Sequence, residues 1–264
     1  MYKPDIKAIA FDFGNTLCRW DEEQYWEISK ATLDSICTLV GTDLESALDV
    51  FKSARDEDSA RNLPNLDEND ITWVWRETAE RLSGRVLKDA EICEVRAAHV
   101  KAFVGVCCLT EGLPALLEQL SGKYRLVVLS NYPVSECIRQ ALETMGISQF
   151  FEKVLVSGDF GIVKPSREIF GEMLTALNLP PENVLYVGDD PIADIVGAWA
   201  SGLPCVQIMN GNHTRKAKML HGVFGTYLRM ALNRPDFANW KNAKPIGILP
   251  SVLELNKWLT DRSA

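Results

Sequence analysis

The chain has 264 residues, of which 47% are hydrophobic and 24% charged, the composition of an ordinary globular protein. Its length allows one or two domains, with a core large enough to need no disulfide or metal for stability. With 28 basic and 36 acidic residues, the formal net charge is −8. This acidic balance argues against a general nucleic-acid-binding surface.

The cysteines and the apolar runs exclude further classes of protein. Seven cysteines form an odd set, and no pair has the C-x-x-C spacing of a structural zinc site. The N-terminal sequence lacks the apolar run and the cleavage site of a signal peptide. No segment approaches the ~20 apolar residues of a membrane span. We therefore expect a cytoplasmic protein without disulfides or a membrane partner.

Short apolar runs without polar alternation predict strands that are buried on both faces of a parallel sheet. These runs are 7–13, 124–130, 153–157, 184–188 and 204–208. Helical patterns separate the later runs, with one around Ile169–Leu177 and another around Ile192–Trp199. Strands that alternate with helices indicate an α/β fold with a doubly wound, Rossmann-like parallel sheet.

A long helical segment separates the first predicted strand from the second. We predict helices around 23–39, 44–61, 68–83 and 88–104. Residues 19–107 then form an all-helical insert, or cap, in a core made of residues 1–18 and 108–264. Because the insert leaves the end of the first strand, where such folds bind ligands, we interpret it as a lid. A merely decorative insertion is the alternative.

The insert is rich in aromatic and basic side chains. We expect its aromatic residues to pack between helices rather than to line a substrate site; they are Trp20, Tyr25, Trp26, Trp73 and Trp75. We expect its basic residues Arg55, Arg61 and Arg76 to lie on a solvated face rather than to contact an anionic substrate.

Polar side chains follow the predicted strands of the core. Asp12 ends the first strand before a Gly14-Asn15 turn, and Ser130-Asn131 ends the second. Each feature taken alone is more typical of a turn or a helix cap than of a catalytic site. Ser130 and the backbone amides near it nevertheless suit a phosphate group.

The second half of the core adds charged candidates. Lys164 precedes a helix that begins near Ser166, and Gly188-Asp189-Asp190 ends the fourth strand, with Asp194 in the next helix. Clustered carboxylates repel one another unless a cation or protons compensate them, and Mg²⁺ prefers such oxygen ligands. Because every candidate follows a strand of one parallel sheet, we expect them to meet at its carboxyl edge.

These four segments resemble the motifs of haloacid-dehalogenase-superfamily hydrolases that carry a helical cap after the first strand. FDFGNTL is similar to the first motif, LSNY to the second, KPSREIF to the third and VGDDPIAD to the fourth. The resemblance covers nearly the whole chain to about residue 208 and recurs near residues 248–259. It implies a hydrolase, most typically a phosphatase of small phosphorylated metabolites.

The resemblance also implies a role for each residue. Asp12 would be the nucleophile that forms an aspartyl-phosphate. Ser130 would bind a phosphate oxygen, with Asn131 and Asn15 beside the substrate. Lys164 would neutralise charge on Asp12 and on the phosphoryl group. Mg²⁺ would be held by Asp12, the backbone carbonyl of Gly14, Asp189 and Asp194, with Asp190 as a neighbouring carboxylate.

One position departs from the pattern. Most phosphatases of this superfamily carry a second Asp two residues after the nucleophile, as a general acid and base, and here that residue is Gly14. Such a group typically contributes ~10²–10⁴-fold in rate. Three interpretations follow: a phosphatase that takes its proton from another group, a dehalogenase-like hydrolase, or a weakly active module that binds a phosphorylated ligand or a protein. We favour the first, because some members of the superfamily with a similar glycine-asparagine turn resemble working phosphatases. The acidic fourth motif argues against the second, a metal-free dehalogenase.

A late segment is basic, although the whole chain is acidic. Residues 214–244 contain seven basic residues and the single acidic residue Asp236. The simpler interpretation is a solvated extra helix with a loop, within a basic insert near 210–245. The alternative is a docking surface for an acidic partner, including the cap of a second subunit in a homo-oligomer.

Overall fold

The structure is a computed structural model that describes residues 5–209, 226 and 229–261. Its centre is a six-stranded sheet in the order β3-β2-β1-β4-β5-β6, and every pairing is parallel. The strands are β1 (Ala8–Phe11), β2 (Arg125–Ser130), β3 (Lys153–Val156), β4 (Val184–Gly188), β5 (Cys205–Ile208) and β6 (Gly247–Leu249). This order confirms the doubly wound α/β fold, with β1 between β2 and β4.

The sixth strand is an element that the sequence pattern did not predict. Gly247–Leu249 pairs in parallel with Val206–Ile208 of β5. The strand has only three residues, and Ile248 is 60% exposed at the edge of the sheet. An apolar run this short and this exposed gives no periodic signal. The chain then forms a 3-10 turn, η7 (Val252–Glu254), and the final helix α12 (Leu255–Asp261).

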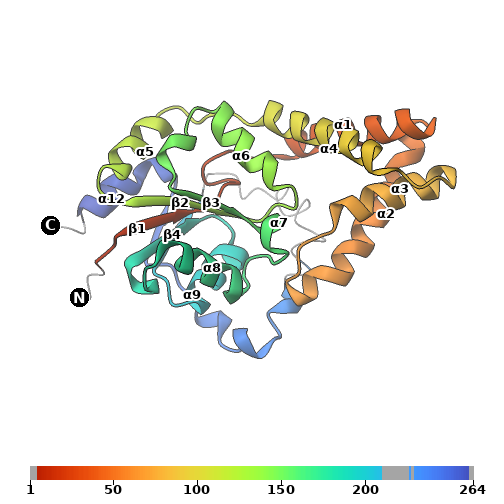
Figure 1. Ribbon diagram of the computed structural model, residues 1–264. Helices are drawn as coiled ribbons and strands as arrows, with labels where there is room; N and C mark the ends of the chain where they lie inside the picture. The colour runs from red at the N-terminus through yellow and green to blue at the C-terminus, as the bar shows by residue number, and fades with distance from the viewer. Residues whose placement is uncertain (1–4, 210–225, 227–228, 262–264) are drawn as a thin grey trace.

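Helices cover both faces of the sheet, because alternate strand residues point to opposite faces. Ile9 and Phe11 belong to the cluster that contains α5 (Leu113–Ser121), α6 (Ser135–Thr144) and α12. Ala8 and Ala10 pack in the opposite cluster with α8 (Arg167–Leu177) and α9 (Gly197–Ala200). Figure 1 shows α5 and α6 above the sheet and α8 and α9 below it. Both faces of β1 are thus buried, which explains its unbroken apolar run.

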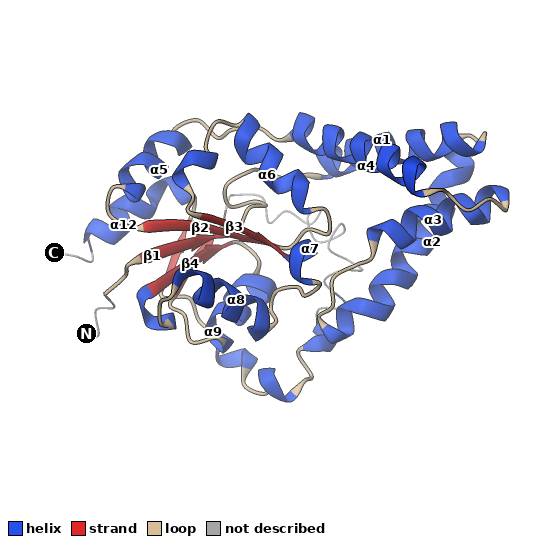
Figure 2. Cartoon of the chain, viewed as in Figure 1, coloured by secondary structure: helices blue, strands red, loops and turns tan. Residues whose placement is uncertain are grey.

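The helical insert, residues 22–106, lies between β1 and α5 in the chain. Its helices are α1 (Glu22–Val40), α2 (Leu44–Asn62), α3 (Ile71–Ser83) and α4 (Asp89–Val106). Figure 2 shows them beyond the carboxyl ends of the strands. The third helix begins at Ile71, later than predicted, because Asp70 caps it by accepting the Trp73 backbone N–H, and residues 63–65 before it form a 3-10 turn, η1.

Local sequence explains where these helices start and stop. Asp21 accepts hydrogen bonds from the backbone N–H groups of Glu23 and Gln24, and this satisfies donors that the first turn of α1 leaves open. The same helix ends at Gly41, whose φ of 73° is left-handed and favours glycine. Capping residues within the insert's own sequence therefore determine where its helices begin and end.

The insert contacts the core a second time through the turn that follows α2. Leu63 and Leu66 pack against Val163 and Phe237 of the core. The Val163 N–H donates to the Leu66 carbonyl over 2.9 Å, and the Glu68 N–H donates to the Gly161 carbonyl over 2.9 Å. The insert is thus held at its two chain connections and also at this turn.

Part of the basic segment supports the same contact. Arg234 donates to the Asn65 carbonyl over 2.6 Å, and Leu232 packs in the cluster of Leu63 and Leu66. The described end of the segment therefore contacts the helical insert of its own chain. Residues 214–225 and 227–228 lie outside the described residues, so a docking role for the whole segment stays a prediction.

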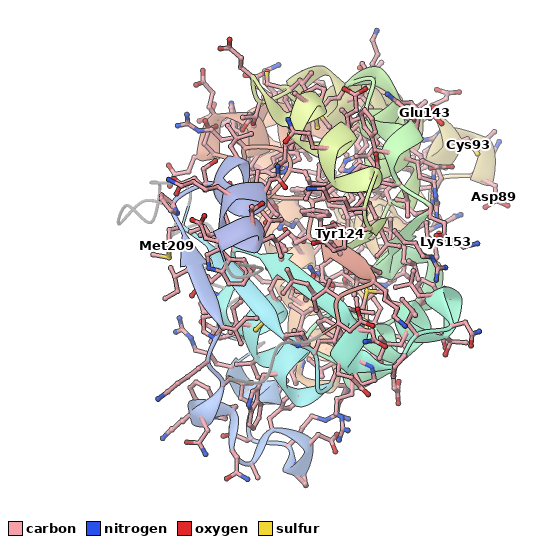
Figure 3. All side chains as sticks on the ribbon, turned by 90° about the vertical axis from the view of Figure 1, so that its left-hand side faces the viewer. Asp89, Cys93, Tyr124, Glu143, Lys153 and Met209 are labelled. Carbon is pink, nitrogen blue, oxygen red and sulfur yellow. The ribbon has the colours of Figure 1, made fainter. Side chains whose placement is uncertain are left out.

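All seven cysteines lie within the described residues, and all are free. Cys93, labelled together with Asp89 at one edge of Figure 3, is exposed on α4, whereas Cys18, Cys137 and Cys205 are buried. No described helix is long and apolar enough to cross a membrane.

Two helical glycines of the core offer a matched test of packing. A Cβ at Gly197 would lie 2.5 Å from the Phe170 ring and 3.0 Å from the Pro165 Cα, whereas a Cβ at Gly171 would meet nothing within 4 Å. We expect Gly197→Ala to lower the free energy of unfolding by about 1–3 kcal/mol through overpacking. Gly171→Ala should instead raise it by about 0.5–1 kcal/mol. Urea denaturation measures both, and equal effects would contradict the packing described here.

Candidate active site

A cavity of about 890 Å³ lies at the carboxyl edge of the sheet. The core supplies residues that follow β1, β2 and β4, and the insert supplies a wall of larger side chains from α1, α2 and α4. The candidates predicted from the sequence all line it: Asp12, Gly14, Asn15, Ser130, Asn131, Lys164, Asp189, Asp190 and Asp194. The carboxyl ends of parallel strands lie at the same edge of the sheet. The topology therefore brings together residues as far apart in the sequence as Asp12 and Asp194.

Lys164 is the centre of the charged network. Its side-chain Nζ donates to Asp12 Oδ1 over 2.7 Å and to Asp194 Oδ1 over 2.7 Å. Lys164 is 1% exposed, Asp12 7% and Asp194 0%. Burial opposes the lysine's charge, but the two carboxylates raise its pKa well above the ordinary value. Burial raises the pKa of Asp12 to about 7, and Lys164 acts in the opposite direction.

Tyr186 holds this network from the inside of the sheet. Its hydroxyl lies 2.9 Å from Lys164 Nζ, 3.0 Å from Asp194 Oδ1 and 3.2 Å from the Leu129 carbonyl. No motif in the sequence pointed to Tyr186. A hydroxyl-bearing side chain inside the otherwise apolar strand VLYVG was the available signal, since a buried Tyr O–H needs a partner.

A glycine lets the acidic segment fold against the strand. A Cβ at Gly188 would lie 2.4 Å from the Asp194 carboxyl carbon, so the residue before Asp189 must be small. Asp194 Oδ2 accepts the Asp190 backbone N–H over 2.9 Å, and Asp190 caps the following π-helical turn η4 (Pro191–Val196). Asp190 is therefore a capping residue, and Asp194 fixes both the backbone of this loop and Lys164.

The donor set fits a hard divalent cation. One carboxylate oxygen each from Asp12, Asp189 and Asp194 lies within 4.8 Å of the other two. Burial, and next the charges of Asp12 and Asp194, raise the pKa of Asp189 well above its ordinary value. Lys164 supplies one positive charge against the buried carboxylates of Asp12 and Asp194 and the half-buried carboxylate of Asp189. The excess negative charge and the oxygen chemistry suit Mg²⁺.

Asn131 links two of the loops that form the site. Its side-chain Nδ2 donates to the Lys164 carbonyl over 3.0 Å, and its Oδ1 accepts the Lys164 backbone N–H over 2.8 Å. Both ends of the amide therefore hold the backbone of the catalytic-lysine candidate. Ser130, one residue earlier, ends β2 and is 3% exposed beside the cavity.

The space beside Gly14 is taken by an indole ring. A Cβ at Gly14 would lie 3.1 Å from Trp20 Cδ1, and the Trp20 ring packs 4.9 Å from that of Phe103. Asn15, in the left-handed region with φ 52°, accepts the Trp20 backbone N–H at its side-chain oxygen over 2.9 Å. The position at which the superfamily pattern has an acid is therefore shaped around Trp20.

Several aromatic residues of the insert line the cavity, contrary to the expectation of helix packing. Trp20, Tyr25 and Trp26 face it, and Trp26 is 40% exposed. Trp75 is fully buried between helices, as expected. Helix periodicity could not separate the two groups, because a cavity wall and a helix interface both use the inward face of a helix.

A hydrogen-bonded chain joins the insert to the core next to the cavity. Tyr132 Oη lies 2.9 Å from His99 Nε2, and His99 Nδ1 lies 2.9 Å from Thr32 Oγ1. Thr32 donates its hydroxyl to the Ile28 carbonyl over 2.7 Å, so it accepts from an Nδ1–H. Burial, together with Arg55 and Arg96, lowers the His99 pKa to about 4. His99 is therefore neutral and accepts the Tyr132 hydroxyl.

Replacement of Lys164 tests the charged network. In metal-free buffer, Lys164→Met leaves the carboxylates of Asp12 and Asp194 buried without their cation, and should cost about 3–5 kcal/mol of unfolding free energy. Adding Asp194→Asn should restore part of that loss, because one uncompensated charge is removed. The control is Lys52→Met, an exposed lysine on α2. A loss no larger than that of the control would refute a stabilising role for Lys164.

Glu68 gives the contact between insert and core a pH dependence. The Ser157 hydroxyl donates to Glu68 Oε2, the Asn69 N–H donates to Oε1 over 2.8 Å, and burial raises the Glu68 pKa from 4.5 to about 7. In this range the folded chain binds more protons than the unfolded chain, so this residue makes stability fall as pH rises.

We expect Glu68→Gln to remove the fall in stability that Glu68 causes as the pH rises. Its stability relative to wild type should increase by about 1–3 kcal/mol between about pH 5 and about pH 8, measured by urea denaturation. Glu172→Gln, an exposed carboxylate on α8, is the control. A pH-independent difference between Glu68→Gln and wild type would show that the Glu68 pKa is ordinary.

Comparison with known proteins places the site in a family. A model described as haloacid dehalogenase-like hydrolase matches residues 6–202. Glyceraldehyde 3-phosphate phosphatase of Methanopyrus kandleri is 32% identical over 212 residues, which cover 79% of this chain and 86% of the relative. The Methanocaldococcus jannaschii protein of the same name is 36% identical over 214 residues, with 79% and 87% covered. Phosphoserine phosphatase of Thermus thermophilus is 30% identical over 138 residues, with 52% and 54% covered.

Solved structures share the whole fold at lower identity. A 2-haloacid dehalogenase from Pseudomonas syringae has a TM-score of 0.66 at 18% identity and covers 98% of this chain and 100% of its own. A HAD phosphatase from Thermococcus onnurineus has a TM-score of 0.60 at 20% identity, with 96% and 98% covered. Together with the family model over residues 6–202, these matches establish that the chain belongs to the haloacid dehalogenase-like hydrolases.

Proposed function

We propose that this chain is a Mg²⁺-dependent phosphatase that cleaves a small phosphorylated metabolite through an aspartyl-phosphate on Asp12. The observation that carries the proposal is the buried arrangement of Asp12, Lys164, Asp194 and Asp189 at the carboxyl edge of the sheet. The names of the relatives support it, since glyceraldehyde 3-phosphate phosphatases align over 79% of the chain.

Each side chain has a step in this reaction. The Asp12 carboxylate attacks phosphorus while the bond from phosphorus to the ester oxygen breaks, and an alcohol leaves with a proton. Water then attacks the phosphorus of the aspartyl-phosphate, which releases inorganic phosphate and regenerates Asp12. Lys164 favours the ionised form of Asp12, against the effect of burial, and offsets the charge on the phosphoryl oxygens. Ser130 and nearby backbone N–H groups bind those oxygens.

Asp12, Asp189 and the Gly14 carbonyl would hold Mg²⁺, with Asp194 supporting the set. When bound, the ion supplies positive charge that stabilises the phosphoryl oxygens. Asp194 already accepts hydrogen bonds from Lys164, Tyr186 and the Asp190 N–H, so we assign it mainly to positioning. The helical insert acts as the cap that excludes water and selects the substrate.

The departure at Gly14 supports a second candidate, a module that binds a phosphorylated ligand with little turnover. Trp20 occupies the space beside Gly14, and the Asn15 amide does not titrate. A proton for the leaving group then has to come from water, from the substrate or from another group. A metal-free dehalogenase is disfavoured, because three clustered carboxylates beside a single lysine repel one another unless a further cation or protons compensate them.

Phosphate release from a panel of esters tests the proposal. With Mg²⁺, the wild-type chain should hydrolyse at least one of glyceraldehyde 3-phosphate, phosphoserine and phosphoglycolate, and a chelator should abolish this. Asp12→Asn should lower kcat by about 10³-fold or more, because the nucleophile is lost. Asp159→Asn, which removes a carboxylate paired with Arg139 outside the cavity, is the matched control.

Three outcomes separate the candidates. No phosphate release by wild type or by Asp12→Asn would refute the phosphatase. If Mg²⁺ with beryllofluoride still raised the melting temperature of the wild type, the binding module would be supported instead. Metal-independent chloride release from haloacids would support the dehalogenase.

A further inference from the structure

One arginine of the insert differs from its neighbours in having no carboxylate partner. Five arginines between Arg61 and Arg96 form ion pairs with acidic residues: Arg61 with Asp58, Arg76 with Asp89, Arg81 with Glu57, Arg85 with Glu91, and Arg96 with Glu136. Arg55, on α2, forms no ion pair or hydrogen bond with any residue that the structure describes. Its guanidinium instead lies 5.0 Å from the centre of the Tyr25 ring and 5.7 Å from that of Phe51.

Four side chains beside this guanidinium are uncharged, and Asp56, the next residue on α2, acts on it through its charge without forming an ion pair. Tyr25 and Phe51 present ring faces, His99 is neutral, and burial raises the pKa of the Tyr132 hydroxyl so that it stays protonated. Burial also lowers the pKa of Arg55 itself, the sign of a cation taken out of water without full compensation. Arginine remains charged under these conditions. Arg55 therefore keeps its positive charge without an ion pair among the described residues, although Asp21, Glu22 and Glu23 also line the large cavity and Asp58 and Glu68 line the small one.

Arg55 faces the place where a substrate would lie. It lines the 890 Å³ cavity that contains Asp12, and also a smaller cavity of about 180 Å³ that continues between insert and core. Tyr25, Asn131 and Tyr132 line both cavities. The core supplies the phosphoryl site, and Arg55 supplies a second charged point on the wall formed by the insert.

We propose that Arg55 binds a second anionic group of the substrate, a carboxylate or another phosphate, and so selects esters that carry a negative charge at both ends. This inference rests on the phosphatase activity proposed above. The planar guanidinium donates two parallel hydrogen bonds to either group, which an ammonium cannot match. The Tyr25 ring packs against the guanidinium and fixes its orientation, and it leaves the positive charge of Arg55 in place.

The test compares two esters that differ in one charged group, phosphoglycolate and ethyl phosphate. Arg55→Met should raise KM for phosphoglycolate by about 10- to 100-fold, the usual range for a lost charge-assisted hydrogen-bond pair. KM for ethyl phosphate and both kcat values should change little. Arg55→Lys should recover only part of the affinity for phosphoglycolate, since lysine restores the positive charge but not the two parallel hydrogen bonds of the guanidinium.

Lys52→Met is the matched control, because it removes one positive charge from the same helix at an exposed position. It should leave both KM values unchanged, which separates a local contact from a general change in charge. Melting curves of both variants check that they remain folded. If Arg55→Met weakened phosphoglycolate and ethyl phosphate equally, the inference would be overturned.

Binding of phosphonates separates this inference from the proposed function, since it needs no turnover. With Mg²⁺, calorimetry of wild type and Arg55→Met should show a loss of affinity for phosphonoacetate, methylenediphosphonate or both, and none for ethylphosphonate. The compound that loses more identifies the second group as a carboxylate or a phosphate. A lack of phosphate release from every ester would refute the phosphatase alone, whereas equal phosphonate affinities would refute the role of Arg55.

Discussion

The site depends on one buried ammonium placed between two carboxylates. Lys164 reaches Asp12 and Asp194 at 2.7 Å each, and all three are almost completely removed from water. Such a group is stable only if the partners are held in place, because desolvation costs more than an imperfect ion pair returns. The Asn131 amide, the Tyr186 hydroxyl and the absence of a side chain at Gly188 all serve to hold these partners.

The cavity has two sides that are built differently, a floor from the core and a wall from the helical insert. The floor comes from the carboxyl ends of parallel strands, whose backbones are fixed by pairing on both sides. The wall comes from the helical insert, which contacts the core again through the turn at residues 63–68. The fixed charges of Lys164, Asp12 and Asp194 lie on the floor, and larger aromatic side chains such as Trp20 and Tyr25 lie on the wall.

The sequence predicted most of the fold, because parallel strands buried on both faces leave unbroken apolar runs. It missed β6, since three residues at a half-exposed edge carry no pattern. For the site, it identified the residues at the strand ends, because topology alone brings these together. It did not identify Tyr186, and it assigned Arg55 to a solvated face. The roles of Tyr186 and Arg55 depend on which side chains lie beside them in the folded chain. A hydrophobic pattern in the sequence contains no information about such neighbours.

By itself, the sequence determined the α/β class, the position of the helical insert and the set of polar residues at one edge of the sheet. These follow from periodicity and from the order of strands along the chain. Only the tertiary structure decided how those residues are used. It made Asn131 a backbone clamp, placed Trp20 beside Gly14, and left Arg55 without an ion pair among the residues that the structure describes. The physical reason is that hydrogen bonds and ion pairs act over about 3–4 Å, and only folding sets such distances between remote residues.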